Sequence, residues 1–359
     1  MTQQYTGLQI LRFVAAMLVA AMHITQAVSI HITGQGESHY WGAGTAGVDI
    51  FFVISGFVMT VSTRGVPARG PARLGAAWVF MKRRLLRIVP LYWFYTLLKA
   101  ALILALPFLA LKSSIEPAHL GASLLFIPMA SPWGLVQPTL PVGWTLNFEM
   151  LFYLVFAVAI ALGAPRMRFC LLVFLALFLA GQTFPQSVPL AFYAQSIIFE
   201  FVLGVCVAQA MMRLGSPSPA LGILLLVAGL LFMFGVGWNT DGERLVPWGA
   251  GAAVVVLGML WLEPWIARAP GAAQLSFLGD ASYSIYLSHT FVVPATVLLL
   301  RGLGVVDATA VLLIAGAMVT VAGCVSHVWI EKPMISFFRR YLFRTAPLQY
   351  QNAGNSPAK

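Results

Sequence analysis

Charged residues are scarce in this sequence. Asp, Glu, Lys and Arg make up 9% of its 359 residues, against about a quarter in an average soluble domain. Cysteine is scarce too, and the three present, Cys170, Cys206 and Cys324, stand alone in apolar runs without paired or metal-ligand spacing. These two shortages exclude an ordinary soluble domain and a disulfide framework, and we expect no metal site.

Apolar residues, in contrast, make up 60% of the chain. They collect in runs of about 17 to 25 residues, the length that crosses a bilayer as a helix. Ten such runs cover residues 8–30, 45–62, 85–107, 143–163, 168–184, 189–212, 219–237, 246–262, 276–300 and 307–330. The sequence therefore predicts an all-α, polytopic membrane protein with ten transmembrane helices. The first run lacks a basic flank and a clear cleavage site, so we expect it to be retained.

The basic residues fall mainly in alternate loops between these runs. Sixteen of the 21 lie on one side: Arg64, Arg69, Arg73, Lys82, Arg83, Arg84, Arg87, Arg166, Arg168, Arg213, Arg268, Lys332, Arg339, Arg340, Arg344 and Lys359. Since Lys and Arg collect in cytoplasmic loops, we expect both termini in the cytoplasm and the protein in the inner (plasma) membrane. A net charge of +10 that follows the loops predicts contact with membrane lipid and no nucleic-acid partner.

We expect one membrane domain over residues 1–338 and a disordered cytoplasmic tail at 339–359. The first run of that domain carries Arg12 and His23, eleven residues apart. On a helix this spacing puts both side chains on one face, about 16 Å apart along the axis. Ionisable groups at membrane depth face a protein interior or a water-filled cavity and are usually functional. In the alternative interpretation, Arg12 snorkels to the headgroups and His23 bonds a neighbouring helix.

Glu149, in the segment GWTLNFEMLFYL, enters the membrane from the opposite direction. It lies about 9 Å inside its span, and His23 lies about 10 Å from the same outer surface. At matched depth we expect the carboxylate to orient His23 as a general base. The alternative is that the two are unrelated buried groups, each satisfied by other partners.

Arg84 and Arg87 lie three residues apart at the cytoplasmic end of the third run, on one helical face. Their planar guanidinium groups suit phosphates. The alternative is that the two arginines only follow the positive-inside rule and anchor the helix at the cytoplasmic surface. That alternative weakens if Arg12, at the same membrane face, joins them.

Five further polar residues within the runs are candidates for lining an internal cavity: Asp49, Glu200, Tyr283, Tyr286 and His289. A structural carboxylate is an equal alternative for Asp49 and Glu200. For the two tyrosines, packing within the bundle is the favoured interpretation.

Six segments occur in order along the chain: LQILRFVAAMLVAAMH, GVDIFFVISGF, RRLLRIVPLYW, GWTLNFEMLFYL, SYSIYLSH and IEKP. Together they resemble acyltransferase family 3, a family of integral membrane acyltransferases. The ordered set covers about residues 8–333, and its beginning is most similar to the exopolysaccharide acetyltransferase branch.

This resemblance implies an enzyme that takes an acyl group, acetyl foremost, from cytoplasmic acyl-CoA. The group is delivered to a hydroxyl of an envelope or exported glycan or of a lipid-linked saccharide. His23 matches the family's essential histidine, and Glu149 matches the acidic residue of its motif. Arg12, Arg84 and Arg87 match basic positions that the resemblance assigns to the coenzyme A phosphates.

A membrane transporter or a lipid-linked sugar flippase is the chief alternative, because buried His, Glu and Asp also form relays and ion paths. No inverted repeat stands out in the sequence, and arginines on one face suit a nucleotide-bearing donor. The acceptor sugar, the acyl group and the oligomeric state stay open.

Overall fold

The computed structural model describes residues 5–36, 40–66, 70, 72–106, 114–214, 218–235 and 243–342. The α-helices, in chain order, are α1 (Thr6–Val28), α2 (Ala46–Ser62), α3 (Ala72–Ala105), α4 (Pro117–Leu124), α5 (Trp144–Leu162), α6 (Arg166–Thr183), α7 (Val188–Tyr193), α8 (Glu200–Leu214), α9 (Pro219–Gly235), α10 (Gly251–Trp261), α11 (Glu263–Ile266), α12 (Ala272–Asp280), α13 (Ser282–Gly302), α14 (Ala308–Ser326) and α15 (Lys332–Leu342). Short 3₁₀ and π segments are η1 (Ser29–Thr33), η2 (Gly42–Thr45), η4 (Pro141–Gly143), η5 (Ser196–Phe199), η6 (Leu245–Ala250) and η7 (His327–Glu331). Within the described ranges the one β-bridge, Ala130 to Val136, is isolated, which confirms the all-α prediction there.

Eight helices of the described chain are long and apolar enough to cross a membrane. The expected spans 219–237 and 246–262 correspond to two shorter apolar helices, Pro219–Gly235 and Leu245–Trp261. At 1.5 Å per residue, the 17 residues of Pro219–Gly235 measure about 25 Å, which is at the lower limit for a transmembrane helix. The protein is therefore a polytopic helical membrane protein. Eight helices among the described residues are long and apolar enough to span the membrane, and the number of ten stays a prediction. Residues 236–242 lie outside the described part.

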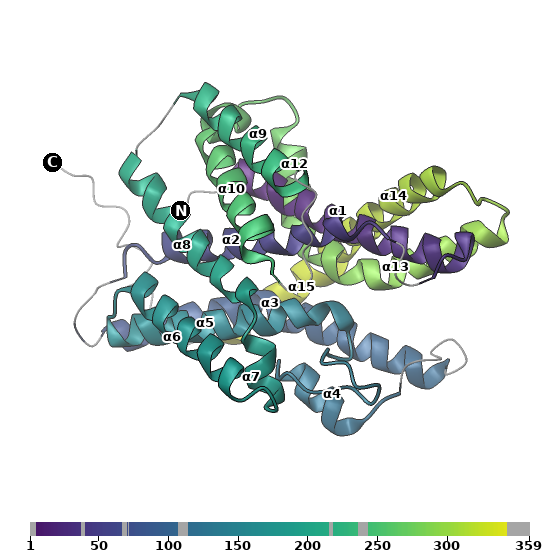
Figure 1. Ribbon diagram of the computed structural model, residues 1–359, viewed down its shortest axis with the longest axis horizontal. Helices are drawn as coiled ribbons and strands as arrows, with labels where there is room; N and C mark the ends of the chain where they lie inside the picture. Colours follow the sequence, from purple (N-terminus) through teal and green to yellow (C-terminus); the bar gives the residue numbers. More distant parts are fainter. Residues whose placement is uncertain are drawn as a thin grey trace.

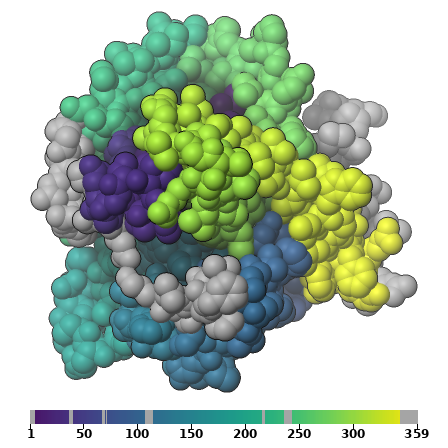
Figure 2. Space-filling view, turned by 90° about the vertical axis from the view of Figure 1, so that its right-hand side faces the viewer, coloured from purple at the N-terminus to yellow at the C-terminus, as the bar shows by residue number. Residues whose placement is uncertain are grey.

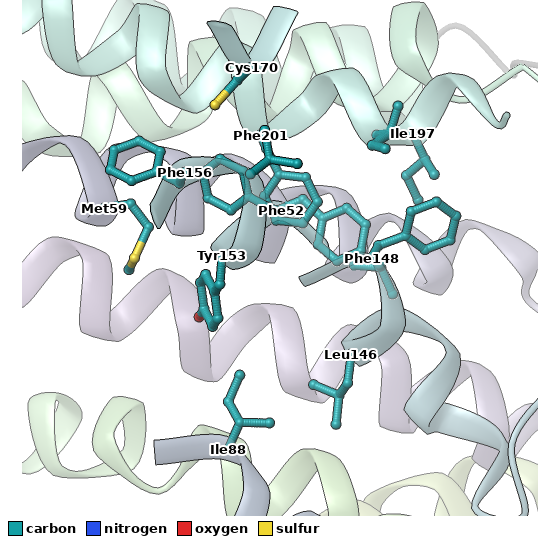
Figure 3. Packing of buried hydrophobic residues seen from close by; sticks show 14 of the residues in the cluster. Phe52, Met59, Ile88, Leu146, Phe148, Tyr153, Phe156, Cys170, Ile197 and Phe201 are labelled. Atoms are coloured by element: carbon teal, nitrogen blue, oxygen red, sulfur yellow. The ribbon is translucent and has the colours of Figure 1, made fainter. Parts of the chain in front are cut away.

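The helices surround an aromatic core formed by α2, α3, α5, α6 and α8 (Figure 3). Phe52 stacks on Phe201, and Phe201 stacks on Phe152, each pair with ring centroids 4.4 Å apart. Offset stacking of this kind favours one arrangement of the helices beyond the area it buries. Figure 1 shows α3, α5 and α6 on one side of α1 and α2, and α9, α10 and α12 on the other.

Two glycines allow α2 to lie directly against its neighbours. A Cβ atom at Gly47 would lie 2.2 Å from the Ala15 carbonyl oxygen of α1, and one at Gly56 would lie 2.0 Å from the Phe201 carbonyl oxygen of α8. Small residues at such contacts bring membrane helices together closely. The contact fixes α1, which carries Arg12 and His23, against α2.

The last helix differs from the expected end of the membrane domain. α14 continues through the π segment η7 into α15, which ends at Leu342. Four residues of the predicted tail, 339–342, are thus helical, and residues 343–359 lie outside the described part of the chain.

Candidate functional site

A cavity of about 130 Å³ lies between α1, α2, α3, α5 and α13. Arg12 of α1 and Arg84 and Arg87 of α3 all line it, so the structure brings these three predicted residues together. Arg84 Nε and Arg87 Nη2 are buried and have no hydrogen-bond partner among the described residues. Buried donors without a partner are costly, and both residues belong to the wall of this cavity. Apolar residues complete the wall, and Figure 3 labels Phe52, Met59, Ile88 and Leu146 among them.

Arg12 is held in place by a relay of side chains. Its Nη1 donates to Gln9 Oε1 at 2.9 Å, and Gln9 Nε2 donates to Asp280 Oδ1 at 2.7 Å. The start of α1 is itself held by Glu263, which accepts hydrogen bonds from two backbone N–H groups of the first turn at 2.6 and 2.8 Å. A carboxylate at this position satisfies otherwise unpaired donors and complements the helix dipole. The guanidinium of Arg12 is therefore positioned by contacts with α12.

Glu149 lies on the arginine side of the bundle. It accepts hydrogen bonds from Tyr153 Oη and, at 3.3 Å, from Ser55 Oγ, and it is within electrostatic reach of Arg12 and Arg87. The predicted pairing with His23 is not formed, because none of the hydrogen bonds described for Glu149 involves that ring. Two residues at equal depth in the membrane can still lie on different sides of the bundle. The rotation of α5 about its axis places Glu149 on the side of the arginines. Three guanidinium groups facing one carboxylate leave the cavity with excess positive charge.

His23 contacts a second histidine. Its ring lies 5.0 Å from the ring of His289, centroid to centroid, and the side chain of Gln26 lies nearby. His289 is fully buried, whereas His23 is half-buried. His23 does not line the arginine cavity. The three arginines therefore line the cavity, whereas His23 lies outside it, next to His289.

Two tyrosines of α13 line the arginine cavity, and one of them, Tyr286, also contacts His289. Tyr283 and Tyr286 both line the arginine cavity. Tyr283 Oη donates to the Ile88 carbonyl oxygen at 2.9 Å, and Tyr286 Oη lies 3.0 Å from Thr145 Oγ1. The ring of Tyr286 is also 5.8 Å from that of His289. Tyr286 and His289 therefore link the wall of the cavity to His23.

The other two candidate carboxylates lie outside the cavity. Asp49 is fully buried and pairs with Arg244, whose Nη2 is 2.5 Å from Asp49 Oδ2. Glu200, also fully buried, lies beside Asp49. Arg244 stacks over the Trp248 ring at 4.7 Å, so the group joins α2 and α8 to the segment before α10. No three His, Cys, Asp or Glu side chains of the described ranges cluster as metal ligands.

The family model for an acyltransferase domain matches residues 5–329 of the chain. The chain belongs to acyltransferase family 3. It is 37% identical over 308 residues to the exopolysaccharide production protein ExoZ of Rhizobium meliloti, an alignment that covers 83% of this chain and 91% of ExoZ. It is also 27% identical over 383 residues to the acyltransferase MdmB of Streptomyces mycarofaciens, with 94% and 93% coverage. No solved structure matches it.

Within this acyltransferase, sequence reasoning missed the partners of Arg12 and Glu149. Gln9 precedes Arg12 by three residues and Tyr153 follows Glu149 by four, spacings that bring side chains together on a helix. That signal was present in the sequence. Asp280, in contrast, comes from a distant helix, and no local pattern pairs it with α1.

Proposed function

We propose that this acyltransferase transfers an acyl group, acetyl foremost, from acyl-CoA to a hydroxyl of an envelope or exported glycan. The observation that carries the proposal is the convergence of Arg12, Arg84 and Arg87 on one cavity that retains buried N–H donors. Guanidinium donors match phosphate oxygens in geometry and charge. The similarity to an exopolysaccharide production protein supports a glycan as the acceptor.

In this proposal the cavity binds only the phosphate-bearing part of acyl-CoA. The cavity of about 130 Å³ is smaller than the roughly 300–1,000 Å³ of sites that enclose a whole ligand. It therefore receives part of a long donor, and the rest lies outside. The distribution of basic residues supports a cytoplasmic location for the arginine side, which is the compartment that supplies acyl-CoA, and the inner membrane as the location of the protein.

In the proposed reaction, a ring nitrogen of His23 takes the proton of the acceptor hydroxyl while the hydroxyl oxygen attacks the thioester carbonyl. The carbon–sulfur bond then breaks, and the CoA thiolate takes the proton from His23. The products are the O-acylated glycan and CoA. Arg12 and His23 are about 16 Å apart along α1, and the ring of His289 contacts both Tyr286, which lines the arginine cavity, and His23.

A labelled transfer assay tests this function. The purified protein in nanodiscs receives acetyl-CoA labelled in the acetyl group and the host's exported polysaccharide, from which mild alkali has removed O-acyl groups. We expect label bound to the polysaccharide and an equal amount of free CoA thiol. Translocation of a lipid-linked saccharide across proteoliposomes, without any transfer of label, would instead support the flippase alternative.

A further inference from the structure

The C-terminal helix α15 separates apolar and basic residues on two faces. A helical projection at 100° per residue puts Met334, Phe337, Phe338, Tyr341 and Leu342 on one side. Lys332, Ser336, Arg339 and Arg340 fall on the other. None of the eleven residues of α15 is buried, and Phe337 and Tyr341 are 53% and 61% exposed. An isolated helix of this pattern lies in the interface of a membrane, with its apolar face in the acyl chains.

The length of the preceding helix supports this location. The continuous helix Ala308–Leu342 has 35 residues, or about 52 Å at 1.5 Å per residue, which exceeds the roughly 30 Å hydrocarbon core. Its last part must therefore leave the core. Tyr95 Oη donates to Ser326 Oγ at 2.7 Å, and Lys82 Nζ donates to the Leu342 carbonyl oxygen at 3.3 Å. α15 thus lies beside the basic part of α3, and Figure 2 shows its yellow residues at the edge of the molecule.

The basic residues of α15 and of the neighbouring part of α3 favour contact with anionic lipids. Arg339 and Arg340 are exposed on α15, and Arg83 is exposed on α3 nearby. No acidic residue occurs between Lys332 and Leu342. Basic side chains beside an apolar helix face are attracted to the anionic headgroups of a cytoplasmic leaflet.

The base of α15 is firmly attached to the bundle. In η7, Glu331 Oε2 lies 2.7 Å from His327 Nδ1 and accepts a hydrogen bond from Ser284 Oγ at 2.7 Å. Ser284 follows Tyr283, which lines the arginine cavity. α15 therefore begins directly after a residue that is hydrogen-bonded to α13.

From these observations we infer that α15 is an anionic-lipid binding helix. Its apolar face inserts at the membrane surface, and Arg339 and Arg340 contact the phosphate groups of acidic phospholipids. This site is separate from the arginine cavity and does not depend on the acyltransferase reaction.

Hydrogen exchange on the full-length protein tests the inference. The protein is reconstituted in nanodiscs of phosphatidylcholine alone or with about a third phosphatidylglycerol, and the exchange of residues 332–342 is followed by mass spectrometry. We expect exchange about tenfold slower with phosphatidylglycerol. Inorganic phosphate added to phosphatidylcholine nanodiscs should not reproduce the effect, because the apolar face must be inserted at the same time.

Two variants complete the test. R339Q/R340Q should lose the response to phosphatidylglycerol, while R268Q, which removes an exposed basic residue of another loop, should keep it. F337S/Y341S should exchange rapidly in both lipids. Equal exchange of the wild type in the two lipids, a full response in R339Q/R340Q, or protection by free phosphate would each overturn the inference.

Discussion

The imidazole rings of His23 and His289 lie 5.0 Å apart, with an angle of 32° between their planes. His289 is fully buried and His23 is half-buried, so His23 is the more accessible ring of the pair. The ring of His289 therefore occupies the place beside His23 that a carboxylate holds in many general bases. His23 is therefore in contact with an aromatic ring where the sequence predicts a carboxylate.

Replacement of His23 should abolish acyl transfer and spare donor binding. A general base contributes about 10²- to 10⁴-fold to a rate, so we expect His23→Ala to lower kcat by at least about 100-fold with an unchanged Kd for acetyl-CoA. His31→Ala, in η1, is the matched control. Normal acetate on the polysaccharide of cells that carry only His23→Ala would contradict this role.

His289 should act through its shape. Phe preserves a flat ring beside His23, whereas Ala leaves a space into which that ring can turn. We expect His289→Phe to retain most of the activity and His289→Ala to lower kcat about tenfold, because misplacement of a catalytic group is costly. Equal loss in the two variants would show instead that a nitrogen of His289 is required.

Removal of an arginine from the cavity should weaken donor binding. A hydrogen bond to a charged group is worth about 1.5–3 kcal/mol, so Arg84→Ala and Arg87→Ala should each raise the KM for acetyl-CoA about tenfold or more. Because the phosphates are far from the thioester, kcat should change little. Arg83→Ala, at an exposed neighbouring position, should behave like the wild type. A fall in kcat with an unchanged KM would refute the assignment to phosphates.

The hydrogen bonds that connect Asp280 to Arg12 through Gln9 should also contribute to binding of the donor. Gln9→Ala removes the hydrogen bond that Gln9 Oε1 accepts from Arg12. If the lost hydrogen bond weakens donor binding by about 1 kcal/mol, the KM for acetyl-CoA should rise roughly fivefold at constant kcat. Steady-state kinetics over a range of donor concentrations measure both constants, and a KM equal to that of the wild type would mean that Arg12 needs no support.

The ion pair between Asp49 and Arg244 should stabilise the fold. Arg244→Met leaves the carboxylate of Asp49 buried without its partner, which costs about 3–5 kcal/mol in comparable cases. We expect a clear drop in the Tm of the detergent-solubilised protein. Asp49→Asn combined with Arg244→Met should recover much of that loss, since the unpaired carboxylate at position 49 is removed. A double variant as unstable as the single one would indicate that the pair is not the source of the stability.

Much of the fold could be predicted from the sequence because length and hydropathy report directly on membrane helices. Eight of the ten expected spans correspond to helices of sufficient length. The other two correspond to shorter apolar helices, Pro219–Gly235 and Leu245–Trp261, and hydropathy alone does not decide whether helices of this length span the membrane. Residues 339–342 of α15 were assigned to a tail because the basic residues Arg339 and Arg340 interrupt the apolar run by which a transmembrane helix is recognised.

The site could be predicted less completely. Positions along one helix are fixed by residue spacing, so the common face of Arg84 and Arg87 follows from the sequence. The rotation of one helix relative to another does not, which is why Glu149 was paired with His23 and lies instead with the arginines. Arg244 was assigned to a loop by charge alone, and its partner Asp49 is 195 residues away.

A structure of the protein with a thioether analogue of acetyl-CoA tests the account most directly. We predict phosphate oxygens within hydrogen-bond distance of Arg84 Nε and Arg87 Nη2, and the acetyl end on the side of Tyr286, pointing toward His23. An analogue bound elsewhere in the bundle, or bound with its acetyl end away from His23, would contradict the account.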